Sequence, residues 1–359
     1  MKKYLNQQDM KDINTSGVFR LIRRAGPITR RQIEAAIDLS WGAISGTTAK
    51  LLREGYIKEV KGTATTGAGR PSVALEVNRE GRVVLGLDVN RSGLAGVVTN
   101  LAGEVLLRIE HEPTATHRDE WIEAVCAMIE ELSALTNGRE ILAIGIAMQG
   151  AVDAARGVAA SFPAKDWQNV PLAAILSERF ALPVYLEHDP DCILYAASAE
   201  RDLQDAILLR ADKGIGMAVM LNTKIFKRFG AFEIGEMPIG KERLMDVATL
   251  TGACARGNAP FHEIAEAAKH GEPNATAIFT QMGEALGIAI DTLAQIFNLR
   301  DFLLCGKLMR YRALLEPSLR ATIAKYPTHT PLQVDYTEVE LAAVGAALLA
   351  IERHELHLD

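Results

Sequence analysis

Length, composition and charge exclude several classes of protein. A chain of 359 residues exceeds one ordinary core and predicts two or three domains. Its 48% hydrophobic and 23% charged residues are typical of a soluble globular protein, not of a disordered or fibrous one. The first ten residues lack the apolar stretch of a signal peptide, and no apolar run approaches the roughly 20 residues that span a bilayer. We therefore expect no membrane partner and a cytoplasmic location.

The distribution of cysteines and charges indicates which kinds of binding site and partner to expect. The four cysteines are scattered without a CxxC pair, which argues against a disulfide framework and against a thiolate zinc site. Residues 1–72 carry 13 basic and 6 acidic side chains, a net charge of +7, whereas the remainder carries 26 and 39, a net charge of −13. A basic module on an acidic body is typical of a phosphate-binding arm, although a solvated basic surface would give the same numbers.

Helical periodicity near the N-terminus predicts three helices, over residues 14–24, 30–37 and 41–54. Thr29 and Ser40 are candidate N-caps of the second and third helices, and Gly55 is a natural stop for the third. Two short helices joined by a tight turn indicate a helix-turn-helix, whose second helix enters the DNA major groove.

The third helix and its surroundings supply candidate DNA contacts. Ser45 can hydrogen-bond a base edge or a phosphate, and Lys50 can neutralise a phosphate. Trp41 either packs against the neighbouring helix, which is the preferred interpretation, or contacts a base. Thr29, Arg30 and Arg31 lie at the predicted N-terminus of the second helix, where the backbone amides and the positive side chains together favour binding of a phosphate. The complete candidate set is Thr29, Arg30, Arg31, Ser40, Trp41, Ser45, Lys50 and Arg70.

Residues 56–77 predict a wing, since a strand is followed by a Gly/Thr-rich tip and a returning strand. Arg70 stands on this tip between Gly69 and Pro71. An arginine there can enter a narrow minor groove, where the negative potential is enhanced. The alternative is a simple turn residue.

From residue 81 the pattern changes to alternating strands and helices. Three strands precede a helix and a buried strand at 141–148, and a similar opening recurs at 206–222 before a long helix at 275–297. This duplication predicts an α/β fold with two ribonuclease-H-like lobes of the actin/hexokinase type and a ligand cleft between them. The expected domains are a winged helix-turn-helix (1–78), a first lobe (79–200), and a second lobe (201–359) whose C-terminal helix returns to the first.

Several short motifs recur in a fixed order along nearly the whole chain, namely Ile28–Ile33, Gly69-Arg70-Pro71, Leu85–Asp88, Gly145–Asp153, Glu187-His188-Asp189 and Glu233-Ile234-Gly235. These segments resemble the ROK family of repressors and sugar kinases. No single motif is decisive, but their order and spacing are specific. The resemblance implies a DNA-binding regulator with a sugar-kinase-like sensor domain.

Compared with family kinases, the nucleotide-binding loops are altered. An Asp-x-Gly-Gly-Thr loop is replaced by residues 88–92, DVNRS, a Gly-Thr-Gly-Ile-Gly loop by residues 212–216, DKGIG, and a Gly-Gly turn by Cys305-Gly306. Asp189 resembles the family's general base, but phosphoryl transfer needs every part in place. We therefore predict no kinase activity, no catalytic residues and no cofactor.

The resemblance also implies where a ligand or metal would bind. Asp189 and Glu233 match carboxylates that hold sugar hydroxyls, and His188 replaces the usual asparagine. The alternative role for both carboxylates is to stabilise the hinge. Glu236 stands where the family places a zinc-binding histidine, and no cysteine follows up to Thr249, which predicts a metal-free site and leaves Glu236 as a further ligand candidate.

Together these observations predict a sequence-specific transcriptional regulator, a repressor of carbohydrate-related genes. We expect a homodimer or a dimer of dimers on palindromic double-stranded operator DNA, with a sugar or sugar derivative as effector. Two alternatives stay open, namely a ROK-type sugar kinase with an accessory DNA-binding arm and a regulator insensitive to any ligand.

Overall fold

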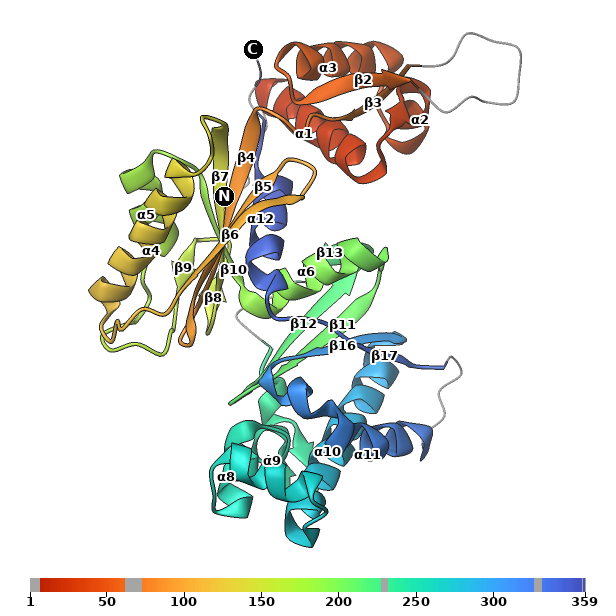
Figure 1. The fold of residues 1–359 in the computed structure, drawn as a ribbon. Coiled ribbons are helices and arrows are strands. Elements are labelled where there is room, and N and C mark those ends of the chain that lie inside the picture. The colour runs from red at the N-terminus through yellow and green to blue at the C-terminus, as the bar shows by residue number, and fades with distance from the viewer. Residues whose placement is uncertain (1–6, 62–72, 227–231, 326–330, 357, 359) are drawn as a thin grey trace.

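The computed structural model describes residues 7–61, 73–226, 232–325, 331–356 and 358, and places an N-terminal module on two α/β lobes (Figure 1). The elements of the module are α1 (Gln7–Ala25), β1 (Ile28–Thr29), α2 (Arg30–Ala36), α3 (Trp41–Arg53), β2 (Ile57–Lys61) and β3 (Val73–Val77). The three strands form an antiparallel sheet in the order β1-β3-β2. Arg70 and most of the predicted wing tip lie outside the described residues.

Local sequence signals set the boundaries of α2 and α3. The Thr29 hydroxyl accepts a hydrogen bond from the Gln32 amide N–H (3.3 Å), and the Gln32 side-chain oxygen accepts one from the Thr29 N–H (2.9 Å), which completes a capping box. The Ser40 hydroxyl caps α3 through the Ala43 N–H (3.3 Å). Gly55 follows α3 with a φ of 72°, which a glycine adopts without strain. Both predicted N-caps are confirmed.

The first helix is longer than predicted, because α1 begins at Gln7 instead of Asn14. Its first turns are polar and lack an apolar period, so the sequence pattern does not reveal them. Further along the helix, the Ser16 hydroxyl accepts a hydrogen bond from the Leu356 N–H (2.9 Å), and Leu356 belongs to the same hydrophobic cluster as Val18. Most helical stability in proteins comes from such packing.

The first lobe contains a five-stranded mixed sheet. In spatial order its strands are β10 (Val184–His188), β7 (Glu140–Met148), β4 (Arg82–Asn90), β5 (Gly93–Asn100) and β6 (Val105–His111). Helices α4 (Arg118–Ala134) and α5 (Leu172–Phe180) cover one face, and a small hairpin, β8 (Val152–Asp153) and β9 (Val158–Ala159), borders the sheet. The antiparallel β4-β5-β6 meander and the parallel strand β7 match the predicted strands, whereas β10 was not predicted.

The second lobe repeats this order of strands. Its sheet runs β13 (Lys224–Ile225), β12 (Ile215–Leu221), β11 (Ala206–Ala211), β16 (Asp301–Cys305) and β17 (Gln333–Tyr336). Helices α10 (Pro273–Phe297) and α11 (Arg312–Lys325) cover one face. The remaining elements are η1 (Ile234–Glu236), β14 (Pro238–Ile239), β15 (Glu242–Arg243), α7 (Leu244–Val247), α8 (Leu250–Gly257), α9 (Phe261–Lys269) and η2 (Lys307–Tyr311).

Two helices, α6 (Asp189–Arg201) and α12 (Leu341–Arg353), lie between the two sheets (Figure 1). They approach so closely that a Cβ on Gly345 of α12 would lie 1.8 Å from the Cys192 carbonyl oxygen of α6. On its other side α12 packs on β4 and β7, where a Cβ on Gly145 would lie 2.0 Å from the Ala346 carbonyl oxygen. Small residues at these contacts make α6, α12 and the first sheet one tightly packed block.

The N-terminal module shares its core with this block. One hydrophobic cluster joins Phe19 and Ile22 of α1 to Val84 of β4 and to Ile351 of α12. Across the described residues, no helix combines the length and the apolar character that a membrane span requires.

Candidate functional site

One face of α3 is open to solvent and carries most of the predicted DNA contacts. Ile44, Thr48 and Leu51 are buried on its inner face, whereas Ser45 is exposed and Lys50 is partly exposed on the outer side. In Figure 1, α3 lies on the side of the module away from the two lobes. A helix with small and polar residues outward has the dimensions of a major-groove reader.

The structure corrects the preferred interpretation of Trp41. We predicted that its ring packs against the neighbouring helix, but the residue is 48% exposed. Trp41 lies on the same side of α3 as Ile44 and Thr48, but it is the first residue of the helix, where about half of its surface stays open to solvent. An indole left in solvent is available for contact with a partner.

The arginines near α2 differ in their contacts. The Arg30 Nε donates to the Thr48 hydroxyl (3.0 Å), and its Nη2 pairs with a Glu59 carboxylate oxygen (3.2 Å). Arg30 therefore braces α3 against β2 inside the module. Arg31, the next residue, is exposed. Thr29 and Ser40 lie at the N-termini of α2 and α3, where their hydroxyls serve as caps.

A second candidate site is the cleft between the lobes, where a buried arginine holds two carboxylates. Arg210, near the end of β11, forms a close ion pair with Asp189 at the start of α6 and a 2.8 Å contact with Asp212. The Asp189 side chain is only 5% exposed. His188 Nε2 lies 3.5 Å from the second Asp189 oxygen. The carboxylate that resembles a general base is therefore already occupied by protein partners.

Burial changes the protonation of the groups around this arginine. Burial raises the pKa of Asp88 to about 7, opposed by the positive charge of Arg210. Burial, together with the negative charge of Asp189, raises the pKa of Asp191 to about 8. Burial lowers the pKa of His188, opposed by the charges of Asp189 and Glu233, so the imidazole is neutral near pH 7.

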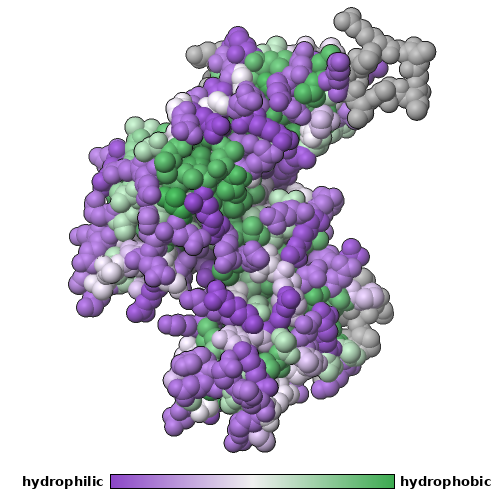
Figure 2. Space-filling model, viewed as in Figure 1, coloured by the Kyte–Doolittle hydropathy of each residue, from purple (hydrophilic) through white to green (hydrophobic). Residues whose placement is uncertain are grey.

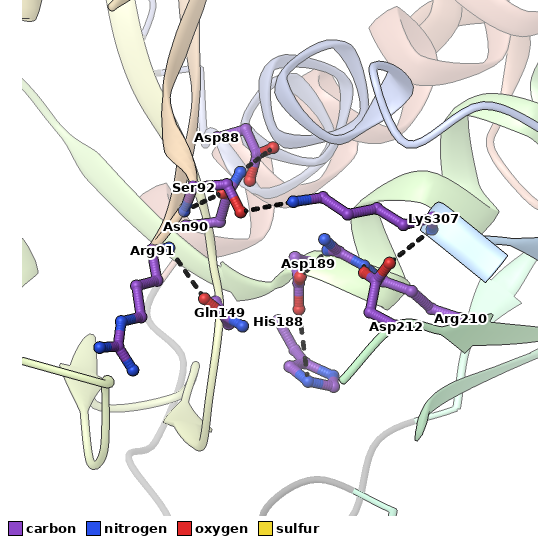
Figure 3. Close-up of polar contacts among 10 residues, drawn as sticks. All are labelled: Asp88, Asn90, Arg91, Ser92, Gln149, His188, Asp189, Arg210, Asp212 and Lys307. Carbon is purple, nitrogen blue, oxygen red and sulfur yellow. Dashed lines mark hydrogen bonds and ion pairs between the residues drawn. The ribbon is translucent and has the colours of Figure 1, made fainter. Parts of the chain in front are cut away.

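One lysine connects the two lobes across the cleft. Lys307, at the start of η2, donates from Nζ to the Ser92 hydroxyl in the β4–β5 turn (3.0 Å; Figure 3). In the same turn the Arg91 N–H donates to the Gln149 side-chain oxygen (2.9 Å). Larger side chains thus fill the turn where family kinases have glycines.

The four predicted ligand residues are only partly brought together. His188 and Asp189 line the cleft. Glu233 is exposed, and its negative charge opposes the lowering of the His188 pKa by burial. Glu236 does not line the cleft, because its exposed carboxylate turns towards Arg243 (3.3 Å). This corrects the expectation that all four face one ligand.

Sequence reasoning missed Arg210 and Lys307. A charged residue inside the apolar strand AILLRA was a signal for Arg210, because an arginine is buried only when it is paired. Lys307 gave no comparable signal, since it stands at an ordinary exposed position and its partner is 215 residues away.

The module is fastened to the body at the end of α1. Glu352 of α12 forms a close ion pair with Arg23 and a 2.9 Å pair with Arg24. Both arginines also donate to the Tyr195 hydroxyl on α6, at 3.2 and 3.4 Å. Arg24 reaches the second lobe as well, where its Nη1 donates to the Thr223 hydroxyl (3.3 Å). We call these five residues the clamp.

The clamp is connected to the cleft between the lobes. Arg353, next to Glu352, pairs with Glu187 of β10 (2.6 Å), and Glu187 directly precedes His188 and Asp189. Helix α6 begins at Asp189 and carries Tyr195 about 9 Å further along its axis, at 1.5 Å per residue. Two short, rigid connections therefore join the cleft to α1.

Comparison with known proteins agrees with this architecture. A family model described as the ROK family matches residues 84–353. The chain is 24% identical to the xylose repressor of Caldicellulosiruptor bescii, over 89% of each chain. It is 26% identical to the DNA-binding transcriptional dual regulator NagC of Escherichia coli, over 95% of this chain and 92% of NagC.

Solved structures share the fold. A ROK family transcriptional regulator, described as a homologue of the E. coli MLC protein, superposes with a TM-score of 0.82 at 22% identity, over 96% of this chain and 97% of its own. A ROK family glucokinase from Streptomyces griseus, in complex with glucose and AMPPNP, gives 0.62 at 21% identity, over 75% of this chain and 99% of its own.

Proposed function

This chain belongs to the ROK family, and from that membership we propose that it is a sequence-specific DNA-binding repressor of carbohydrate-related genes. The observation that carries the proposal is the extent of the match. Relatives named as a xylose repressor and an N-acetylglucosamine repressor match 89% and 95% of this chain, which extends beyond residues 84–353 into the N-terminal module, whereas the glucokinase covers 75%, a share comparable to residues 84–353.

The N-terminal module supports a winged helix-turn-helix. Helices α2 and α3 follow one another closely, and β2 and β3 pair beside them as the stem of a wing. In this proposal α3 enters the major groove, Ser45 contacts base edges, and Arg31 and Lys50 neutralise phosphates. Arg70 reads the adjacent minor groove from the wing.

The cleft supports a sensor without kinase activity. A general base must have a free oxygen within hydrogen-bond reach of the substrate proton, but Asp189 is held by Arg210. Lys307 and Ser92 meet across the space between the lobes. The alternative, a sugar kinase with a DNA-binding arm, requires ATP-dependent phosphorylation of a sugar by the purified protein, and that activity would decide in its favour.

The clamp supports a route from effector to DNA. Arg24 contacts α6, α12 and the second lobe, so closure of the lobes would change its partners and reorient α1. An effector shifts DNA affinity only if it binds the two arrangements unequally. A ligand-insensitive regulator would keep the same DNA affinity whatever occupies the cleft.

The second copy expected for a palindromic operator has a candidate surface on the first lobe. Val105 and Leu106 of the edge strand β6 are 47% and 40% exposed, and Figure 2 shows an apolar area on this part of the lobe. An exposed apolar patch at a sheet edge is typical of an association surface. We propose a homodimer that presents two copies of α3 to successive major grooves.

The metal-free prediction rests on what replaces the family's zinc ligands. Glu236 pairs with Arg243, which also pairs with Asp246 (2.7 Å), so an exposed ion-pair network stands there. A structural zinc site needs about four nitrogen or sulfur ligands. Stoichiometric zinc in the purified protein would contradict this part of the proposal.

Duplex DNA binding measured by fluorescence anisotropy, across a series of salt concentrations, tests the proposed function. Lys50→Ala should weaken binding to all sequences and reduce the magnitude of the salt slope by about 1, whereas Ser45→Ala should change sequence preference without changing the slope. Lys224→Ala, on the exposed β13 of the second lobe, is the control. Equal effects of Lys50→Ala and Lys224→Ala would contradict the assignment.

A further inference from the structure

A partly buried arginine lies where helix α3 meets the stem of the wing, the strand pair β2–β3. Arg30 is the first residue of α2, and its side chain is 24% exposed. Its Nε donates to the Thr48 hydroxyl on α3 (3.0 Å), and its Nη2 pairs with a Glu59 carboxylate oxygen on β2 (3.2 Å). A planar guanidinium holds its partners in fixed directions. One rigid group therefore joins three elements of the module.

Thr48 connects this arginine to the residue that we propose to read bases. Thr48 is 0% exposed, and its hydroxyl also donates to the Ser45 carbonyl oxygen (3.2 Å), one turn earlier in α3. A hydrogen bond from a charged donor is stronger than one between neutral groups, and successive hydrogen bonds polarise one another. Two hydrogen bonds thus link the Arg30 guanidinium to the backbone of Ser45.

Apolar packing alone defines the placement of α3 less sharply. Ile44 and Leu51 of α3 belong to the same hydrophobic cluster as Ile33 of α2. Hydrophobic contacts are non-directional, so they hold α3 on the module but resist a small rotation or shift of the helix only weakly. Hydrogen bonds weaken when their geometry changes. A binding side chain must be held within about 0.5 Å of its productive position, which makes the directional contact at Thr48 important.

The charge of Arg30 is already compensated by a carboxylate. The Glu59 side chain is 49% exposed, so solvent screens the pair and it contributes little to stability. The next residue differs, since Arg31 is exposed and no carboxylate among the described residues pairs with it. Binding to a phosphate releases counterions only when the protein supplies a positive charge that is not already neutralised. Of the two arginines, Arg31 suits a phosphate contact and Arg30 does not.

We propose that Arg30 is a positioning residue for DNA reading, which fixes α3 against the stem of the wing through Thr48 and Glu59 and sets sequence discrimination without contacting DNA. The proposal rests on the DNA-reading function proposed above and separates Arg30 from the phosphate contacts of Arg31 and Lys50. The major and minor grooves have fixed dimensions along a duplex. The angle between α3 and β2 therefore determines whether the helix and the wing fit their grooves at the same time.

Equilibrium binding of the full chain to two duplexes tests the proposal. One duplex carries the motif that the wild type enriches from a randomised pool, and the other is a shuffled sequence of the same length and composition. Arg30→Met should weaken binding to the motif duplex about tenfold, the cost of one mismatched base pair, and leave the affinity and the salt slope of the shuffled duplex unchanged. Arg30→Lys should lose the same discrimination, because lysine keeps the charge but not the planar fork. Arg31→Met, the matched control, should weaken both duplexes and reduce the magnitude of the slope by about 1.

Two substitutions at Thr48 separate positioning from packing. Thr48→Val keeps the volume of the side chain and removes the hydroxyl, whereas Thr48→Ser keeps the hydroxyl and removes a methyl group. Positioning predicts that Thr48→Val loses about tenfold in discrimination and that Thr48→Ser retains it, and packing predicts the reverse. The loss in the double variant Arg30→Met/Thr48→Val should not exceed that of either single variant, because both changes break the same connection. A variant that unfolds the module loses helical circular dichroism and the shuffled duplex as well, and the two Thr48 variants then decide.

Several outcomes would overturn the proposal. A reduced salt slope in Arg30→Met, or unchanged discrimination in Arg30→Lys, would identify Arg30 as a phosphate contact. Discrimination that persists in Thr48→Val would show that α3 is placed without this hydrogen bond. Absence of any enriched motif for the wild type would overturn the proposed DNA-reading function and this proposal with it, whereas the other outcomes leave that function intact.

Discussion

Glu352 fastens the N-terminal module to the body, and its replacement by glutamine tests the clamp. The Glu352 side chain is 13% exposed and that of its partner Arg23 is 8% exposed. Breaking a buried pair by removing one partner costs about 3–5 kcal/mol. Arg24 is 39% exposed, so solvent screens its share. Because glutamine keeps the shape and one acceptor oxygen, we expect Glu352→Gln to cost about 3 kcal/mol.

Hydrogen exchange of α1 measures this cost where it acts. A loss of about 3 kcal/mol in local stability accelerates exchange of the α1 core amides, such as Val18 and Ile22, roughly 100-fold. Glu110→Gln is the control, since the Glu110 side chain is 61% exposed in its pair with Arg108 and the expected change is below about 0.5 kcal/mol. Acceleration of less than tenfold in Glu352→Gln, or an equal effect in the control, would refute the reasoning.

The clamp also predicts a pH dependence. Burial opposes ionisation of Glu352, but the charges of Arg23 and Arg24 outweigh it and lower the pKa of this carboxyl. A lowered folded pKa stabilises the chain above the unfolded value of about 4.3, and this contribution is lost as the pH falls through the folded pKa. Protection of α1 should therefore decrease in acid in the wild type and change less in Glu352→Gln.

Asp88 should act in the opposite direction, because burial raises its pKa to about 7, so the folded chain holds a proton that the unfolded chain releases above about pH 4. Stability then falls by up to about 1.4 kcal/mol per pH unit between these values, and Asp88→Asn should show a flatter Tm profile in calorimetry from pH 5 to 8; parallel profiles would contradict this. Gly345→Ala places a Cβ 1.8 Å from a carbonyl oxygen of α6 and should cost about 3 kcal/mol, whereas Gly17→Ala, with nothing within 4 Å in the middle of α1, should be neutral or stabilising. The Tm of the two variants tests this difference in stability, and equal Tm values would contradict the tight packing of α6 against α12.

Local signals in the sequence were sufficient for helix α3 and for most strands of the two sheets. The caps at Thr29 and Ser40 act within three residues, and the strands of both lobes are apolar runs bounded by turns. The first turns of α1 were not predictable, because most of their residues are polar and show no helical period of apolar residues. Asp12 in these turns is buried, which the local sequence pattern does not indicate.

The cleft was predictable as a location but not as a charge network. Asp189 and His188 were identified from a motif, yet the state of Asp189 depends on Arg210, which is 21 residues away and reaches it because α6 packs on β11. The lysine at position 307 meets Ser92 only because the two lobes face each other. Contacts between residues of different sheets depend on how the chain is folded, and the periodicity of a single helix or strand does not predict them.

Selection of bound sequences from a randomised duplex pool, with the full chain at physiological salt, tests the DNA-reading function most directly. The account predicts enrichment of one motif, arranged as an inverted repeat, and a changed base preference within each half-site for Ser45→Ala. Recovery of the pool without any enriched motif, or the same motif from Ser45→Ala and from the wild type with equal strength, would contradict the assignment of α3 as the reader.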